Sequence, residues 1–127
     1  MPLVRLDGDP GAVDFGRSLS GAGDVNGDGY ADVIVGATGQ AYVFYGTSSG
    51  LGSAGRTLLT GPFADDYGRA VAGAGDVNGD GYADVLVGAP AFSSNSGRFY
   101  LYLGSATGLI TSPTHTVSRY PSRYSST

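Results

Sequence analysis

The sequence predicts an all-β protein made of two repeated units, each a four-stranded antiparallel sheet. Three observations lead to this prediction: an internal repeat, short apolar runs typical of strands, and a lack of helix-forming charged residues. Of the 127 residues, 23 are Gly and 6 are Pro, while hydrophobic residues still reach 41%, so turns are frequent and a core can form. All seven basic residues are Arg and all eleven acidic residues are Asp, so Glu and Lys, which favour long helices, do not occur.

The same composition excludes several classes of protein. Cys is absent, which excludes disulfide frameworks, thiol catalysis and thiolate metal centres. No apolar run approaches the roughly 18 residues of a membrane span, and the N-terminus has neither the basic start nor the apolar stretch of a signal peptide. With a net charge of −4 and no basic patch, we expect no nucleic-acid partner.

An internal repeat organises the chain. The segment 15–37, which reads FGRSLSGAGDVNGDGYADVIVGA, returns 52 residues later as 67–89 with few changes. A second element, YGTSSGL at 45–51, returns as LGSATGL at 103–109, a spacing of 58 residues. The second copy is therefore longer, and the extra residues lie within 90–97, where an insertion fits a surface hairpin loop.

Each copy contains the apolar runs of four strands. The expected strands, in chain order, are 17–22, 33–35, 41–45, 56–60, 69–74, 85–87, 99–103 and one around 114–118. The Thr38-Gly39 turn predicts a β-hairpin, and the continuous apolar runs are typical of strands covered on both faces. Four antiparallel strands in roughly 50 residues, covered by copies of themselves, describe a β-propeller blade. A sandwich of two small sheets is the alternative.

The repeat also sets the expected domain boundaries. We expect a leading outer strand and turn in 1–14, a first blade in 15–66, a second blade in 67–118 and a polar tail in 119–127. Residues 4–7 align with the outer strand of the first copy, so the leading strand is a candidate to complete a neighbouring sheet.

Two Asp-rich windows, 24–32 and 76–84, share the pattern D-x-N-G-D-G-Y-A-D. Side-chain oxygens at positions 1, 3, 5 and 9 of a tightly curled, Gly-containing loop suit Ca²⁺, which takes six to eight oxygen ligands. The residue at position 7 would give only its backbone carbonyl. Zn²⁺ is not expected without nitrogen or sulfur ligands, and an EF-hand would need an acid at position 12, where Val35 and Val87 stand. The alternative is a plain Asn-Gly or Asp-Gly turn, although such a turn needs no Asp at position 9.

The order of these motifs resembles the FG-GAP repeat of integrin α-subunits and many bacterial extracellular proteins. The shared motifs are Phe/Tyr-Gly, Gly-Ala-Gly-Asp, the Asp-rich loop, Val-Gly-Ala and the closing Gly-Leu turn, over about residues 15–51 and 67–109. The resemblance implies β-propeller blades with a Ca²⁺ ion in the loop between the first two strands of each blade. The ligands that it implies are Asp24, Asn26, Asp28, the Tyr30 carbonyl and Asp32, and in the second loop Asp76, Asn78, Asp80, the Tyr82 carbonyl and Asp84.

Two blades do not close a ring, since propellers have about four to eight blades. We therefore expect the remaining blades of a parent protein as partners, or a homo-oligomer in which three or four copies supply six or eight blades. The expected function is that of a calcium-stabilised extracellular or periplasmic scaffold for adhesion or protein–protein interaction. A lectin-like carbohydrate-binding module and an engineered or reconstructed propeller fragment without a natural ligand are the alternatives. No enzymatic activity is expected, because His115 is the only His and neither Cys nor Glu occurs.

Overall fold

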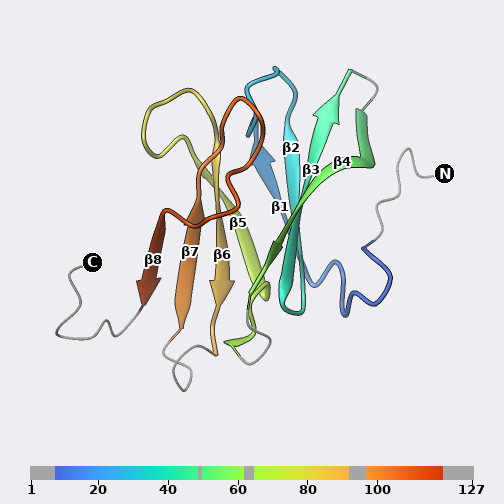
Figure 1. Cartoon of the computed structure of the whole chain (residues 1–127), viewed down its shortest axis with the longest axis vertical. Helices are drawn as coiled ribbons and strands as arrows, with labels where there is room; N and C mark the ends of the chain where they lie inside the picture. Colours follow the sequence, from blue (N-terminus) through green and yellow to red (C-terminus); the bar gives the residue numbers. More distant parts are fainter. Residues whose placement is uncertain (1–7, 49, 62–64, 92–96, 119–127) are drawn as a thin grey trace.

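The structure is a computed structural model that describes residues 8–48, 50–61, 65–91 and 97–118. These residues form two four-stranded antiparallel sheets that lie side by side, and they contain no helix (Figure 1). The strands are β1 (Ser18–Gly23), β2 (Asp32–Ala37), β3 (Gln40–Thr47), β4 (Gly50–Thr60), β5 (Ala70–Gly75), β6 (Asp84–Ala89), β7 (Arg98–Tyr102) and β8 (His115–Ser118). The predicted all-β fold of two four-stranded antiparallel units is confirmed.

Each sheet is a simple meander, in which strand order in space equals strand order in the chain. The predicted hairpin at Thr38-Gly39 is present, because Ala37 pairs with Gln40 across it. Strands β2, β3, β4 and β6 are longer than predicted, and the difference is largest in β4. It begins at Gly50 rather than at Arg56, because β3 continues to Thr47 and pairs with its start beyond a bulge. Gly and Ser are poor strand formers, so this extension carries little signal in the sequence.

Three regions of the sequence prediction lie outside the described residues. They are the leading strand at 4–7, most of the insertion in 90–97 and the polar tail at 119–127. The boundaries proposed between the leading segment, the two blades and the tail therefore stay predictions.

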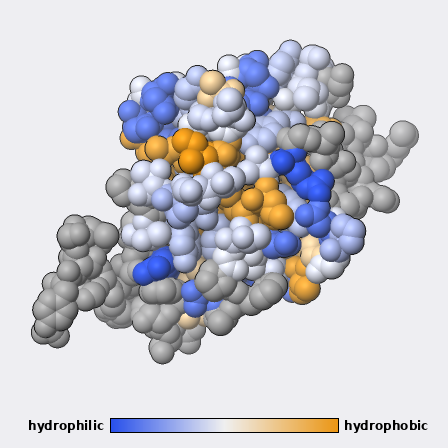
Figure 2. All heavy atoms as spheres, in the orientation of Figure 1, coloured by the Kyte–Doolittle hydropathy of each residue, from blue (hydrophilic) through white to orange (hydrophobic). Residues whose placement is uncertain are grey.

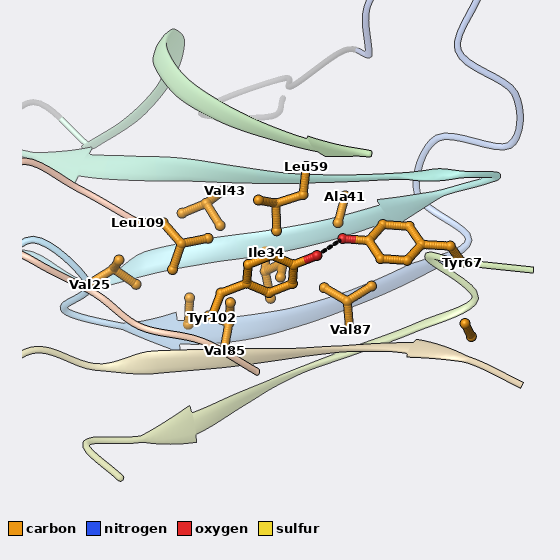
Figure 3. Packing of buried hydrophobic residues seen from close by; sticks show 12 residues of the cluster. Val25, Ile34, Ala41, Val43, Leu59, Tyr67, Val85, Val87, Tyr102 and Leu109 are labelled. Atoms are coloured by element: carbon orange, nitrogen blue, oxygen red, sulfur yellow. Dashed lines mark hydrogen bonds between the residues drawn. The ribbon is translucent and has the colours of Figure 1, made fainter. Parts of the chain in front are cut away.

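The main hydrophobic core lies between the two sheets (Figure 3). Ile34, Val43 and Leu59 from the first sheet pack against Val85 and Val87 from the second, and all five side chains are buried. Burial of apolar surface stabilises such a contact by about 25 cal/mol per Å². The first sheet is thus covered by the second, as expected for adjacent propeller blades.

The aromatic residue that opens each copy packs on the sheet of its own copy. Phe15 makes an edge-to-face contact with Tyr42, with ring centroids 5.1 Å apart. Tyr67 makes the equivalent contact with Tyr100 at 5.3 Å, and its hydroxyl lies 2.5 Å from that of Tyr102. Because Tyr67 sits inside the core between the sheets, this hydroxyl pair gives two buried polar atoms a hydrogen-bond partner.

Each sheet has a face toward the sheet that follows it in the chain, which we call its trailing face. On the first sheet this face presents Ile34, Ala41 and Val43, which the second sheet buries. The equivalent residues of the second sheet are Leu86, Phe99 and Leu101, of which Leu86 and Leu101 are half-buried and Phe99 is 54% exposed. On the side of the molecule that Figure 2 shows, hydrophobic residues form separate patches among hydrophilic ones.

Candidate metal loops

The two Asp-rich windows connect the first and second strands of each sheet. Residues 24–31 follow β1 and residues 76–83 follow β5, and both loops lie at the same end of the molecule (Figure 1). The glycines at positions 4 and 6 have positive φ values in both loops, 72° and 90° at Gly27 and Gly29. Such φ values strain residues with a side chain, so these glycines allow the tight curl that the sequence predicted.

The Asp at position 1 organises each loop through backbone hydrogen bonds. The Asp24 carboxylate accepts the N–H groups of Asp28 at 3.1 Å and Gly29 at 2.8 Å. In the second loop Asp76 accepts the N–H groups of Gly79, Asp80 and Gly81 at 2.8–3.1 Å. These donors, that of Gly81 above all, lower the pKa of Asp76, since they favour its charged form.

Positions 1, 3 and 5 come together in the first loop. The Asn26 amide lies between Asp24 and Asp28, and the atom that faces them is 3.3 and 3.1 Å from their Oδ1 atoms. In one orientation of the amide this atom is nitrogen, which donates to both carboxylates. In the other it is oxygen, so three oxygens converge on one point, an arrangement that a cation would stabilise.

The Asp at position 9 has a different environment. Asp32 and Asp84 are buried, at 1% and 0% exposure. The two oxygens of Asp32 accept the N–H groups of Val25 at 2.8 Å and Gly46 at 2.7 Å. Burial raises the pKa of Asp32, and these two hydrogen bonds oppose the shift.

Asp84 repeats this arrangement in the second sheet. Its oxygens accept the N–H groups of Val77 at 2.8 Å and Gly104 at 2.9 Å. The position-9 carboxylate therefore ties the start of each loop to the region where the third strand ends, at Gly46 within β3 and at Gly104 just after β7. The sequence prediction gave these residues a role toward metal only and missed this structural role, because the partners at Gly46 and Gly104 are distant in sequence.

The donor set of the loops suits a hard divalent cation, because every side-chain donor is an oxygen. The described residues nevertheless contain no group of three or more His, Cys, Asp or Glu side chains arranged to hold a metal ion. The structure brings positions 1, 3 and 5 together in the first loop and directs position 9 toward backbone amides. The aromatic residues at position 7 differ between the loops, since Tyr30 is exposed and Tyr82 is half-buried.

The second loop also contacts the first loop, which the sequence did not reveal. The Ala83 N–H donates to the Asp24 carbonyl at 3.0 Å, and the ring of Tyr82 lies against Gly27. Because the two loops have the same sequence, no residue pattern distinguishes the covered loop from the other one.

Comparison with known proteins identifies the family. Residues 24–87 match the FG-GAP-like repeat. This chain belongs to the FG-GAP-like repeat family. The resemblance inferred from the sequence is thereby confirmed, and the two sheets are β-propeller blades.

The similar proteins include integrin α-subunits. This FG-GAP chain is 40% identical to integrin alpha-PS3 of Drosophila melanogaster over 88% of its length, and 33% identical to human integrin alpha-6 over 90%. It is 36% identical to mouse integrin alpha-IIb over 88%. The chain spans only 11–12% of the length of these relatives. Within the described residues no helix is long and apolar enough to cross a membrane.

Proposed function

We propose that this chain is a calcium-stabilised β-propeller module that acts outside the cytosol as a scaffold for adhesion or protein–protein interaction. The observation that carries the proposal is the packing of two FG-GAP blades through a shared apolar core, with the metal-type loops side by side at one end. Integrin α-subunits match this chain over about 90% of its length, which supports a role in adhesion or protein contact. No catalytic role is proposed.

The proposed role of Ca²⁺ is structural. The proposed ligands are Asp24, Asn26, Asp28, the Tyr30 carbonyl and Asp32, with Asp76, Asn78, Asp80, the Tyr82 carbonyl and Asp84 in the second loop. Each loop holds three carboxylates, which repel one another when no cation neutralises them. A bound Ca²⁺ would supply that neutralisation and fix the loop between the first two strands of its blade.

The proposed partners are further blades. Two blades leave the trailing face of the second sheet without a neighbouring sheet among the described residues, and that face carries exposed apolar side chains such as Phe99. Repeat units of this kind need neighbours for stability. The neighbours are either the other blades of a longer protein or copies of this chain in a ring of six or eight blades.

Thermal unfolding with and without Ca²⁺ tests the metal role. We expect the wild-type melting temperature to rise in millimolar Ca²⁺ relative to excess chelator, because the ion binds only the folded loops. Asp28→Ala and Asp80→Ala should each reduce this rise and change the melting temperature in chelator much less. Equal losses in Ca²⁺ and in chelator would show that the loops are turns without a metal role.

A further inference from the structure

The two loops have the same sequence, DVNGDGYAD, but different surroundings. Val25, at position 2 of the first loop, is 0% exposed, whereas its equivalent Val77 is 51% exposed. The hydrogen bond from position 2 to the buried Asp is the same in both loops, at 2.8 Å. The difference in exposure between Val25 and Val77 therefore comes from the second blade, which covers the first loop, and not from contacts within each loop's own blade.

The second blade holds the backbone of the first loop at three points. The Ala83 N–H donates to the carbonyl of Asp24 at 3.0 Å. The Tyr82 ring is so close to Gly27 that a Cβ added there would lie 2.6 Å from its Cε1 atom. A Cβ added at Gly104 would lie 2.3 Å from the carbonyl oxygen of Val25. Positions 1, 2 and 4 of the first loop are thus fixed from outside their own blade.

The second loop has no such cover among the described residues. Gly79 is the equivalent of Gly27, with φ 73° against 72°, yet nothing lies within 4 Å of a Cβ added there. Residues 76–81 are all exposed. This loop keeps the contacts from its own blade, including the Gly104 N–H to Asp84, and lacks only those that a following blade would make.

We propose that cation binding by each loop is coupled to docking of the blade that follows it. Loop 24–32, which the second blade already holds, binds Ca²⁺ more tightly than loop 76–84 in the isolated chain. Loop 76–84 reaches a similar affinity only when another blade covers Val77. This inference rests on the proposed calcium role of the loops.

The physical reason is preorganisation. A loop must adopt one conformation to direct several oxygens at one ion, and the free loop loses conformational entropy in doing so. Contacts from the next blade restrict the loop before the ion arrives, so binding costs less. Coupling of this kind is reciprocal, so Ca²⁺ in a loop must strengthen docking of the next blade by the same factor.

The structure also indicates what kind of partner completes the second site. The covering blade must bring an aromatic ring to Gly79 and a free backbone N–H to the Asp76 carbonyl, as Tyr82 and Ala83 do for the first loop. A further FG-GAP blade carries both groups in its own loop. In a second copy of this chain they would be Tyr30 and Ala31.

Calorimetric titration with Ca²⁺ of two single-site variants tests the proposal. Asp80→Ala leaves loop 24–32 intact, and Asp28→Ala leaves loop 76–84 intact. At a concentration where light scattering gives the mass of one chain, we expect Asp80→Ala to bind Ca²⁺ at least about ten-fold more tightly than Asp28→Ala. Equal affinities, or the reverse order, would overturn the coupling.

A second pair of variants tests the contact itself, each in the Asp80→Ala background, so that only loop 24–32 binds. Tyr82→Ala removes the ring that lies against Gly27, whereas Tyr30→Ala removes the same side chain from the binding loop and serves as the matched control. Coupling predicts that the change in the other blade, Tyr82→Ala, weakens Ca²⁺ binding several-fold and more than Tyr30→Ala does. A larger effect of Tyr30→Ala, or none from either, would mean that the loop acts alone.

Hydrogen exchange gives a readout that does not depend on the aromatic ring of Tyr82. In Asp80→Ala, where the second loop no longer binds, Ca²⁺ should slow exchange of the Ala83 amide, which bonds to Asp24 across the interface. Exchange that is indifferent to Ca²⁺ would contradict the coupling. A wild-type chain that binds no Ca²⁺ at millimolar concentration would instead refute the calcium role itself, so the two failures are distinguishable.

Discussion

At the scale of single residues, the buried carboxylates show what the sequence predicts and what it does not. The repeated Asp at position 9 identified Asp32 and Asp84 as special, since a plain turn needs no acid there. Their hydrogen bonds to Gly46 and Gly104 join residues 14 and 20 positions apart, so only the fold reveals them. The donors at Val25 and Val77 lie within the windows, but no pattern marks them as partners.

Replacing Asp32 with Asn tests the structural role of position 9 without metal. The amide nitrogen of the new side chain would face a backbone N–H, so one buried donor would lose its acceptor. We expect Asp32→Asn in excess chelator to lower the free energy of unfolding by about 2–3 kcal/mol. Urea denaturation measures the change. The control Asp28→Asn, at an exposed loop position, should cost less than about 1 kcal/mol; similar losses would contradict the role of the buried pair.

The lowered pKa of Asp76 predicts a dependence of stability on pH. A carboxyl group whose pKa is lower in the folded state stabilises the fold above its unfolded pKa of about 3.9. That contribution is lost as the pH falls through the lower, folded value. In chelator, urea midpoints should therefore show wild type above Asp76→Asn at pH 7, with the gap closing below about pH 4. A gap that stays constant from pH 7 to 3 would contradict the prediction.

At the scale of elements, the Val-Gly-Ala motif of the second strand has a packing reason. A Cβ at Gly36 would lie 2.2 Å from the backbone carbonyl oxygen of Gly68, which belongs to the Tyr-Gly pair of the next blade. Two of the repeated motifs, Val-Gly-Ala and Phe/Tyr-Gly, thus meet across the blade interface. The sequence predicted both motifs and their strands, whereas their contact depends on how the sheets stack.

The equivalent glycines of β2 and β6 provide a matched experiment. Gly36 has the next blade against it, whereas a Cβ at Gly88 would find its nearest atoms at an ordinary 3.4 Å. We expect Gly36→Ala to lower the free energy of unfolding by about 3 kcal/mol and Gly88→Ala by less than about 1 kcal/mol. Chemical denaturation of both variants measures the difference. Equal effects would mean that the loss of stability at Gly36 comes from strand propensity and not from the neighbouring blade.

At the scale of the whole molecule, the contact between the blades includes polar groups beside its apolar core. Ser18 donates to the Gly68 carbonyl of the second blade at 3.0 Å, and Arg17 forms an ion pair at 3.0 Å with Asp66, which directly precedes that blade. Tyr45 accepts the N–H of Leu109 at 2.9 Å. The residues of the second blade that correspond to Arg17, Ser18 and Tyr45 are Arg69, Ala70 and Leu103. The second blade thus offers a following blade fewer polar side chains. The alignment of the two copies shows these replacements, but only the structure shows that the replaced residues make contacts between blades.

Self-association through these faces is testable with a pair of charged variants. Two exposed apolar residues lie on opposite sides of the pair of blades. Val77, on the second loop, is on the trailing side of the second blade, and Leu19, on β1, is on the opposite side of the first blade, which we call its leading side. A head-to-tail contact uses both surfaces and can therefore form rings or larger assemblies. We expect the wild-type mass in Ca²⁺, measured by light scattering, to rise with concentration, and Val77→Asp and Leu19→Asp to stay at the mass of one chain.

A mixture of the two variants gives the decisive result. Val77→Asp keeps an intact leading side and Leu19→Asp keeps an intact trailing side, so one contact remains between unlike chains. An equal mixture should therefore reach the mass of two chains and stop there, and chelator should reduce this association, since the loop at Val77 borders the contact. A wild-type chain that keeps the mass of one chain at every concentration would show that the neighbouring blades belong to a longer protein and not to copies of this one.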